Sequence, residues 1–339
     1  MSISRRALLK ASLTASAATL LTGRTGFAIA QDRKFNYKCA MNTPMTHTIY
    51  LRLAEAVERI KTQTDGKVVI NLFPSSQLGS DTDVLGQVRA GALETVIMPG
   101  VVLANLVPMA SLNSVGFAFK DYPAVWKAMD GGLGAHIRSQ IAKTNLVVQD
   151  KIWDNGFRHL TGWQPVNSPA DLAGKKVRVP VSPILLSLFK ALGAAPAPIN
   201  FNELYSALQT HVIDAQENPL TIISTGKLYE VQKFCAMTSH VWDGYWFMSN
   251  KKAWEALPAP WRTIVETNLA ESAVAQRADS EKLADTLKQE LSAKGLTFST
   301  PDTTPFRDAL RKNGYYSEWQ KKFGDEAWGH LEATVGKLA

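Results

Sequence analysis

The sequence predicts an α/β fold built from two units, on three observations. Strand-like and helix-like segments alternate along the chain, which is typical of α/β folds with largely parallel sheets. The alternation starts again near Asn155 with no low-complexity linker before it, so we expect strands that cross between the units and not a flexible tether. Residues 258–294 form a helical pattern of about ten turns, which is long enough to span both units.

The first unit is expected to alternate strands with helices. Its strands are predicted over residues 35–41, 67–73 and 94–100. A helix is predicted over residues 46–64, because Leu53, Val57 and Ile60 share one face. Ser80 is expected to cap the N-terminus of a second helix, since a serine oxygen can accept a backbone N–H there.

The second unit repeats this alternation. Strands are predicted within residues 145–162, 174–180, 211–219 and 234–250, and helices over residues 182–193 and 202–210. The helix that begins at Ser182-Pro183 combines a capping serine with proline at the first helical position. Gly193 is expected to end this helix.

Residues 1–30 are predicted to be a cleaved signal peptide. They begin with the basic segment SRRALLK, continue with small and apolar residues, and end in Ala28-Ile29-Ala30. This arrangement is typical of a secretory signal and not of a membrane span. The pair Arg5-Arg6 fits the twin-arginine export route, so the sequence predicts a periplasmic protein.

The charge balance argues against a nucleic-acid partner. The whole chain carries a formal net charge of +7, but residues 1–30 contain four basic residues and no acidic ones. The remaining chain therefore has a net charge of only +3. No basic run interleaved with aromatic residues remains, and no other apolar stretch is long enough to span a membrane.

The cysteines and histidines show no metal-ligand spacing. Cys39 and Cys235 are interpreted as two buried thiols, although an exported protein could also pair them in a disulfide. His47 and His240 stand alone in the sequence and are interpreted as capping or packed residues. Without H-x-x-x-H, C-x-x-C or clustered carboxylates, we expect neither a metal ion nor a cofactor.

Three polar residues suggest a binding site in the second unit. Arg178 lies between Val177 and Val179 in a predicted strand, so its side chain points to the face opposite the two valines. A buried guanidinium needs a negative partner. Arg158 near the start of the unit and Asn218 after its next strand are expected at neighbouring loop edges. Arginine binds a carboxylate through two hydrogen bonds, so the set predicts a carboxylate site, with ordinary surface residues as the alternative.

The sequence resembles the periplasmic solute-binding proteins of the tripartite ATP-independent (TRAP) transporters, of the C4-dicarboxylate-receptor (DctP) type. The resemblance covers essentially the whole mature chain. The segments that show it are INLFPSSQLGSDTDVLGQVRAGAL (70–93), NGFRHLTG (155–162), DLAGKKVRVPVSP (171–183), INFNELYSALQ (199–209), DAQENP (214–219) and LYEVQKF (228–234).

The resemblance implies a two-lobe periplasmic binding protein fold with a ligand cleft between the lobes. Lobe I would comprise residues 31–155 and about 244–283, and lobe II residues 156–243 and about 284–339. It also implies a carboxylate ligand and, as partners, the small and large TRAP membrane subunits of DctQ and DctM type. The family includes dimers, and the choice between monomer and dimer stays open.

The resemblance further assigns roles to individual residues. Arg178 matches the arginine that binds the ligand carboxylate, and Arg158 and Asn218 match its supporting ligands. Glu217 is expected to orient an arginine, and Phe201 matches an aromatic residue of the cleft wall.

The nature of the ligand is predicted from apolar and aromatic positions. Met41, Met98 and Val181 occupy positions that resemble the polar contacts of sialic-acid receptors, so sialic acid is not expected. Trp153 and Trp242 flank the apparent crossings between the units and are candidate contacts for the ligand body, with core packing as the alternative. Together these residues favour a compact or aromatic carboxylate, such as a 2-oxo or hydroxy acid.

Two other function classes stay open at this point. An exported enzyme acting on a small acid would fit the twin-arginine signal, but G-x-S-x-G, H-E-x-x-H and a G-x-G-x-x-G after a strand are all absent. A periplasmic sensor module for a membrane kinase would share the fold and the site. The sequence therefore predicts a receptor without catalysis and leaves the identity of the acid open.

Overall fold

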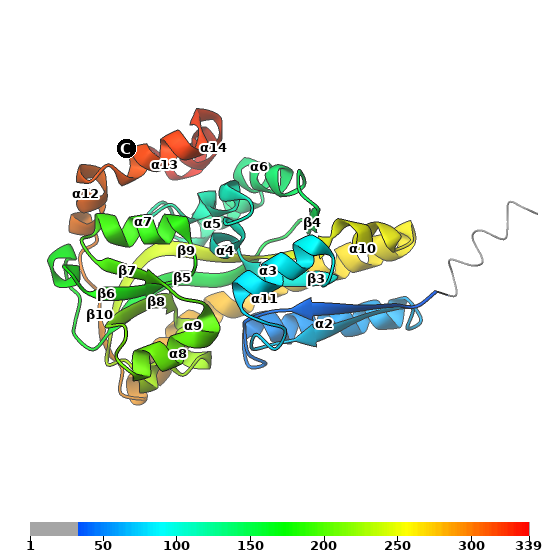
Figure 1. The fold of residues 1–339 in the computed structure, drawn as a ribbon, viewed down its shortest axis with the longest axis horizontal. Helices are drawn as coiled ribbons and strands as arrows, with labels where there is room; N and C mark the ends of the chain where they lie inside the picture. Colours follow the sequence, from blue (N-terminus) through cyan, green and yellow to red (C-terminus); the bar gives the residue numbers. More distant parts are fainter. Residues whose placement is uncertain (1–32, 339) are drawn as a thin grey trace, which may run out of the picture.

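The computed structural model describes residues 33–338, which form one continuous mixed sheet covered by helices (Figure 1). The predicted signal peptide lies outside the described residues. The strands are β1 (Phe35–Ala40), β2 (Val68–Phe73), β3 (Thr95–Pro99), β4 (Leu146–Val148), β5 (Trp153–Gly162), β6 (Lys176–Val179), β7 (Ala195–Pro198), β8 (Ala215–Pro219), β9 (Phe234–Asn250) and β10 (Thr297–Ser299).

The α-helices follow the same order along the chain. They are α2 (Thr48–Gln63), α3 (Asp81–Ala90), α4 (Gly100–Leu103), α5 (Tyr122–Met129), α6 (Gly132–Ile141), α7 (Pro183–Ala191), α8 (Phe201–Gln209), α9 (Leu220–Thr225), α10 (Lys251–Ala256), α11 (Ala259–Ala293), α12 (Thr304–Lys312), α13 (Tyr315–Phe323) and α14 (Asp325–Val335). Three short 3₁₀ helices are η1 (Pro108–Ser114), η2 (Pro169–Leu172) and η3 (Leu228–Glu230).

The sheet has two parallel halves joined by a pair of antiparallel strands. Its order is β2-β1-β3-β9-β5-β8-β6-β7, with β4 and β10 added beside β9. Strands β1 to β3 are parallel to one another, and so are β6 to β8. Between these halves, β9 runs antiparallel to β3, and β5 runs antiparallel to β8. Strands β5 and β9 are also antiparallel to each other. We call β1–β3 with their helices the first unit, and β6–β8 with theirs the second unit. The predicted crossing strands are therefore present as β5 and β9.

Helix α11 confirms the predicted long helix. Its 35 residues extend over about 52 Å at 1.5 Å per residue. It packs against α2 of the first unit and against α9 of the second unit. Among the described residues, no helix is both long enough and apolar enough to cross a membrane.

The last three helices connect the second unit with the segment that follows the first unit, along the upper edge of the molecule in Figure 1. Helix α12 packs against α7 in the second unit, and α14 packs against α5 and α6, which follow the first unit in the chain. The exact division of the chain into lobes stays a prediction.

Several local expectations can be compared with the structure. Ser80 caps α3, with its side chain accepting from the Asp83 backbone N–H and the Asp83 carboxylate accepting from the Ser80 backbone. Helix α2 begins two residues later than predicted. His47 is its N-cap residue, and the His47 side chain accepts a hydrogen bond from the Ile49 backbone N–H. The prediction for Ser182 is corrected: it occupies the N-cap position of α7, but its side chain makes no capping hydrogen bond. Both cysteines are buried free thiols, as interpreted from the sequence.

Candidate functional site: a buried arginine between the two units

Arg178 lies within β6 and is almost completely buried, with 1% of its surface exposed. Its Nε donates to the Ile199 backbone oxygen at 2.8 Å. Among the described residues it forms no ion pair, and its two Nη groups donate no hydrogen bond. Burial lowers the pKa of Arg178 from 12.5 to about 10, because the nearby carboxylates of Glu217 and Asp81 do not offset the loss of water. The guanidinium is still charged at neutral pH and lacks a direct anionic partner.

Arg158, by contrast, is neutralised by two carboxylates. It lies in the middle of β5, where its Nε and Nη2 donate to the Glu217 carboxylate and its Nη1 donates to Asp243 Oδ2 at 2.6 Å. Its Nη2 also donates to the Glu217 backbone oxygen at 2.7 Å and to Asn218 Oδ1 at 3.2 Å. Burial works against the charge, but Glu217 and Asp243 raise the pKa of Arg158 above its ordinary value. The contacts of Arg158 are thus largely internal to the protein.

His240 contacts the carboxylate of this ion pair. The His240 ring contacts the Glu217 carboxylate through Nε2 at 3.1 Å and the Thr238 hydroxyl through Nδ1 at 2.8 Å. Burial works to raise the pKa of Glu217, but the charge of Arg158 and the bonds from His240 and Arg158 lower it below its ordinary value. Glu217 is therefore ionised, and it holds Arg158 in one position.

Further polar side chains surround the two arginines. Asn155 Nδ2 donates to Asp243 Oδ2 at 2.9 Å, and the Tyr245 hydroxyl and Asp81 both bond to Asn42, at 3.1 Å each. Burial raises the pKa values of Asp81 and Asp243. Asn155 Oδ1 and Asp243 Oδ1 are buried without a hydrogen-bond partner in the described part of the chain. These two oxygens could accept hydrogen bonds from a ligand hydroxyl.

Contacts between the two units enclose this region. Asn105 follows α4 in the first unit, and its Nδ2 donates to the Val181 backbone oxygen just after β6, at 2.6 Å. Thr82 at the start of α3 is bonded to Asn200, the N-cap residue of α8, with the amide nitrogen 3.2 Å from the hydroxyl. The two units therefore touch at two points close in sequence to the ends of β6 and β7.

The predicted aromatic and apolar contacts lie in two different environments. Phe201 is half-buried at the start of α8 and lines a pocket of about 270 Å³ together with Asn42 and Tyr205. Trp153, Trp242 and Met98 are instead buried in the hydrophobic core. The Trp242 indole donates to Asp154 Oδ1 at 2.8 Å and packs edge-to-face on Trp126. A direct ligand contact by these three residues stays a prediction.

The site residues lie within strands. Arg178 lies in β6, as predicted, next to the last residue of that strand. Arg158 and Asn218, which were expected at neighbouring loop edges, lie within β5 and β8. Asp243 lies inside β9. The chain bends here through β-bulges in the pairing of β5 with β9, which lets polar strand residues face one another.

Two site residues were missed in the sequence. Asn42 directly follows β1, and Asp81 is the first residue of α3. Ligands of open α/β sheets bind beyond the carboxyl ends of strands. Asn42 is a polar residue directly after a predicted strand, so its position in the sequence could have indicated a place in the site. Asp81 had no comparable signal, because an acidic residue in the first turn of a helix is already explained by the helix dipole.

A positively charged side chain enclosed between two α/β units defines a binding protein that could close on a small anion. The chain belongs to the bacterial extracellular solute-binding protein family 7, DctP, which it matches over residues 39–322. This confirms the family that the sequence motifs indicated.

Individual relatives agree with this assignment. Solute-binding protein RD1_1052 of Roseobacter denitrificans is 33% identical over 257 residues, which cover 75% of this chain and 78% of that protein. Its solved structure with bound L-galactonate gives a TM-score of 0.83 at 28% identity, over 89% of this chain and 99% of that one. The 2,3-diketo-L-gulonate-binding periplasmic protein YiaO of Escherichia coli is 31% identical, covering 84% of this chain and 86% of that protein. A TRAP periplasmic solute-binding protein of Sulfurospirillum deleyianum with bound succinate gives a TM-score of 0.84 at 26% identity, over 89% and 99% of the two chains.

Proposed function

We propose that the protein is a periplasmic receptor that captures an organic acid through the Arg178 guanidinium, without catalysing a reaction. The single observation that supports this role is the buried charge of Arg178, which lacks an ion pair among the described residues. A ligand carboxylate would form two parallel charge-assisted hydrogen bonds with the free Nη groups. Arg158 would act differently, as a fixed positive group whose charge is already balanced by Glu217 and Asp243.

The ligand class follows from the remaining polar groups. The unpartnered oxygens of Asn155 and Asp243 favour a ligand with at least one hydroxyl donor. The similar proteins described above bind L-galactonate, 2,3-diketo-L-gulonate and succinate, which are all carboxylates. A compact hydroxy or 2-oxo acid satisfies both considerations. Sialic acid is not proposed, because Met41 and Met98 are buried apolar side chains that cannot pair its hydroxyls.

The delivery route is proposed from the family. Solute-binding proteins of TRAP transporters work with membrane subunits, and we propose the same partners here. The periplasmic location agrees with the names of the similar proteins. Export by the twin-arginine route rests on residues 5 and 6 of the sequence alone.

The test is a thermal-shift screen of organic acids on residues 31–339, after unfolding and refolding to remove any carried-over ligand. A ligand that binds only the native state raises the melting temperature by mass action. We expect a carboxylate to stabilise the wild type, and Arg178→Ala to lose the shift. If neutral sugars or amines stabilise the protein and acids do not, the carboxylate proposal is wrong. Conversion of the stabilising acid into a product would contradict the proposal of a receptor without catalysis.

A further inference from the structure

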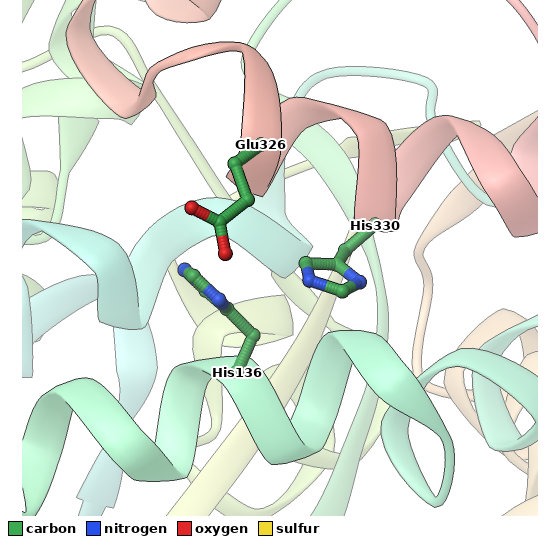
Figure 2. Close-up of side chains that lie close together, drawn as sticks. All are labelled: His136, Glu326 and His330. Carbon is green, nitrogen blue, oxygen red and sulfur yellow. The ribbon is translucent and has the colours of Figure 1, made fainter.

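Three side chains of types that can bind a metal ion lie together between α6 and α14. Figure 2 shows His136 on α6 facing Glu326 and His330 on α14, with the three polar groups directed toward one another. One ligand atom of each residue, an imidazole nitrogen or a carboxylate oxygen, lies within 4.8 Å of the others. The two helices pack against each other, so the geometry does not depend on a loop.

The three residues are held in suitable positions. Glu326 and His330 are four residues apart on α14, which puts them on the same helix face. The rings of His136 and His330 lie with their centroids 5.0 Å apart and their planes tilted by 37°. Gly132 lies beside the His330 ring, since a Cβ atom at its position would be 3.4 Å from His330 Nδ1, an ordinary van der Waals contact.

One atom of the cluster lacks a partner in the protein. His136 Nε2 is buried and makes no hydrogen bond with any described residue. Because no described protein group occupies this imidazole nitrogen, it is available to coordinate a metal ion.

We propose that His136, Glu326 and His330 form a binding site for a divalent transition-metal ion such as Zn²⁺. Two imidazoles and one carboxylate are a common donor set for zinc, and a water molecule would complete the tetrahedron. Metal–ligand bonds of about 2.0–2.2 Å place tetrahedral ligand atoms about 3.3 Å apart, so small side-chain rotations bring the three groups to bonding distance. Glu326 and His330 are four residues apart, but His136 lies far from them along the chain, so the sequence alone does not predict the three-residue site.

The metal ion would join two parts of the molecule. Helix α14 is the end of the C-terminal segment that starts on the second unit with α12, and α6 belongs to the part of the chain that follows the first unit. A bound ion would therefore join the C-terminal helices, which start on the second unit, to the part of the chain that follows the first unit. This role is separate from the arginine site and does not depend on the nature of the organic acid.

The test uses residues 31–339 stripped of metal with EDTA and dialysed. Zn²⁺ is titrated by calorimetry, and Co²⁺ is used as a probe whose visible absorption distinguishes four-coordinate from six-coordinate binding. We expect one Zn²⁺ per chain, a rise in melting temperature with Zn²⁺, and a four-coordinate Co²⁺ spectrum. His136→Ala and His330→Ala should each lower the Zn²⁺ affinity at least tenfold and remove the temperature shift. All three residues are at least partly exposed, so these variants should fold.

The control is His211→Ala, which removes an exposed histidine that stacks on Trp163 and lies outside the cluster. It should bind Zn²⁺ like the wild type. The proposal is overturned if the wild type binds no Zn²⁺, or if His211→Ala reduces binding as much as the cluster variants do. It is also overturned if His136→Ala keeps full affinity, because the ion would then bind to α14 alone and would not join the two helices.

Discussion

The replacement Arg178→Met separates a binding role from a structural role for this arginine. Burial lowers the pKa of Arg178 from 12.5 to about 10, which corresponds to about 3 kcal/mol of unfavourable free energy for the charged side chain in the ligand-free fold. Methionine removes this cost and fills a similar volume. It also leaves the Ile199 carbonyl without its donor, at a cost of about 1–3 kcal/mol. The two effects oppose each other, so the free energy of unfolding should stay within about 2 kcal/mol of the wild-type value or increase.

Arg158→Met is the matched control. The same change at this position leaves the buried carboxylates of Glu217 and Asp243 without their cation, and the expected loss is about 3–5 kcal/mol. Both variants are compared with the wild type by urea unfolding of ligand-free protein, followed by tryptophan fluorescence. Arg178→Met should also weaken binding of the acid by at least about 30-fold, equivalent to about 2 kcal/mol. If Arg178→Met destabilises the ligand-free protein as much as Arg158→Met, Arg178 is a structural residue and the reasoning fails.

Three other predictions concern the surroundings of the site. Burial raises the pKa of Asp154 to about 7 from 3.8, so the folded protein holds a proton that the unfolded chain releases, and stability falls as pH rises from about 4 to 7. Asp154→Asn should remove this pH dependence. The free energy of unfolding of the variant, relative to that of the wild type, should therefore increase by an amount on the order of 4 kcal/mol between about pH 4 and pH 7. If urea unfolding shows the same difference between the two proteins at every pH, Asp154 does not hold the proton. Glu217→Gln should lower the free energy of unfolding by about 3 kcal/mol because Arg158 loses half of its negative partners, and a loss below 1 kcal/mol would show that the ion pair is dispensable. Ser80→Ala removes the cap of α3 and should cost about 1 kcal/mol in the same assay, while an unchanged midpoint would indicate that Asp83 alone satisfies the helix end.

Much of the fold could be predicted because local signals agreed with the tertiary structure. The alternation of strands and helices, the 35-residue helix α11 and the Ser80 cap were all visible as periodicity or capping patterns. The Ser182 cap was predicted but makes no hydrogen bond in the structure, because capping needs a side-chain orientation that the residue type does not determine.

The site was predicted less completely than the fold. Arg178 was identified from its position between two valines, and the absence of a protein partner for it required the structure. The contrast between Arg178 and Arg158 was not visible in the sequence, since Asp243 is 85 residues from Arg158 along the chain. His136 and His330 show the same limit, because pairing of distant residues depends on how α14 folds back onto α6.

The most direct test of the central claim is a crystal structure of the complex with the acid that gives the largest thermal shift. In this complex, the ligand carboxylate should accept hydrogen bonds from both Nη atoms of Arg178, at about 2.7–2.9 Å. Arg158 should keep its bonds to Glu217 and Asp243 in that complex. A carboxylate bound to Arg158 with these bonds broken, or bound away from both arginines, would contradict the account.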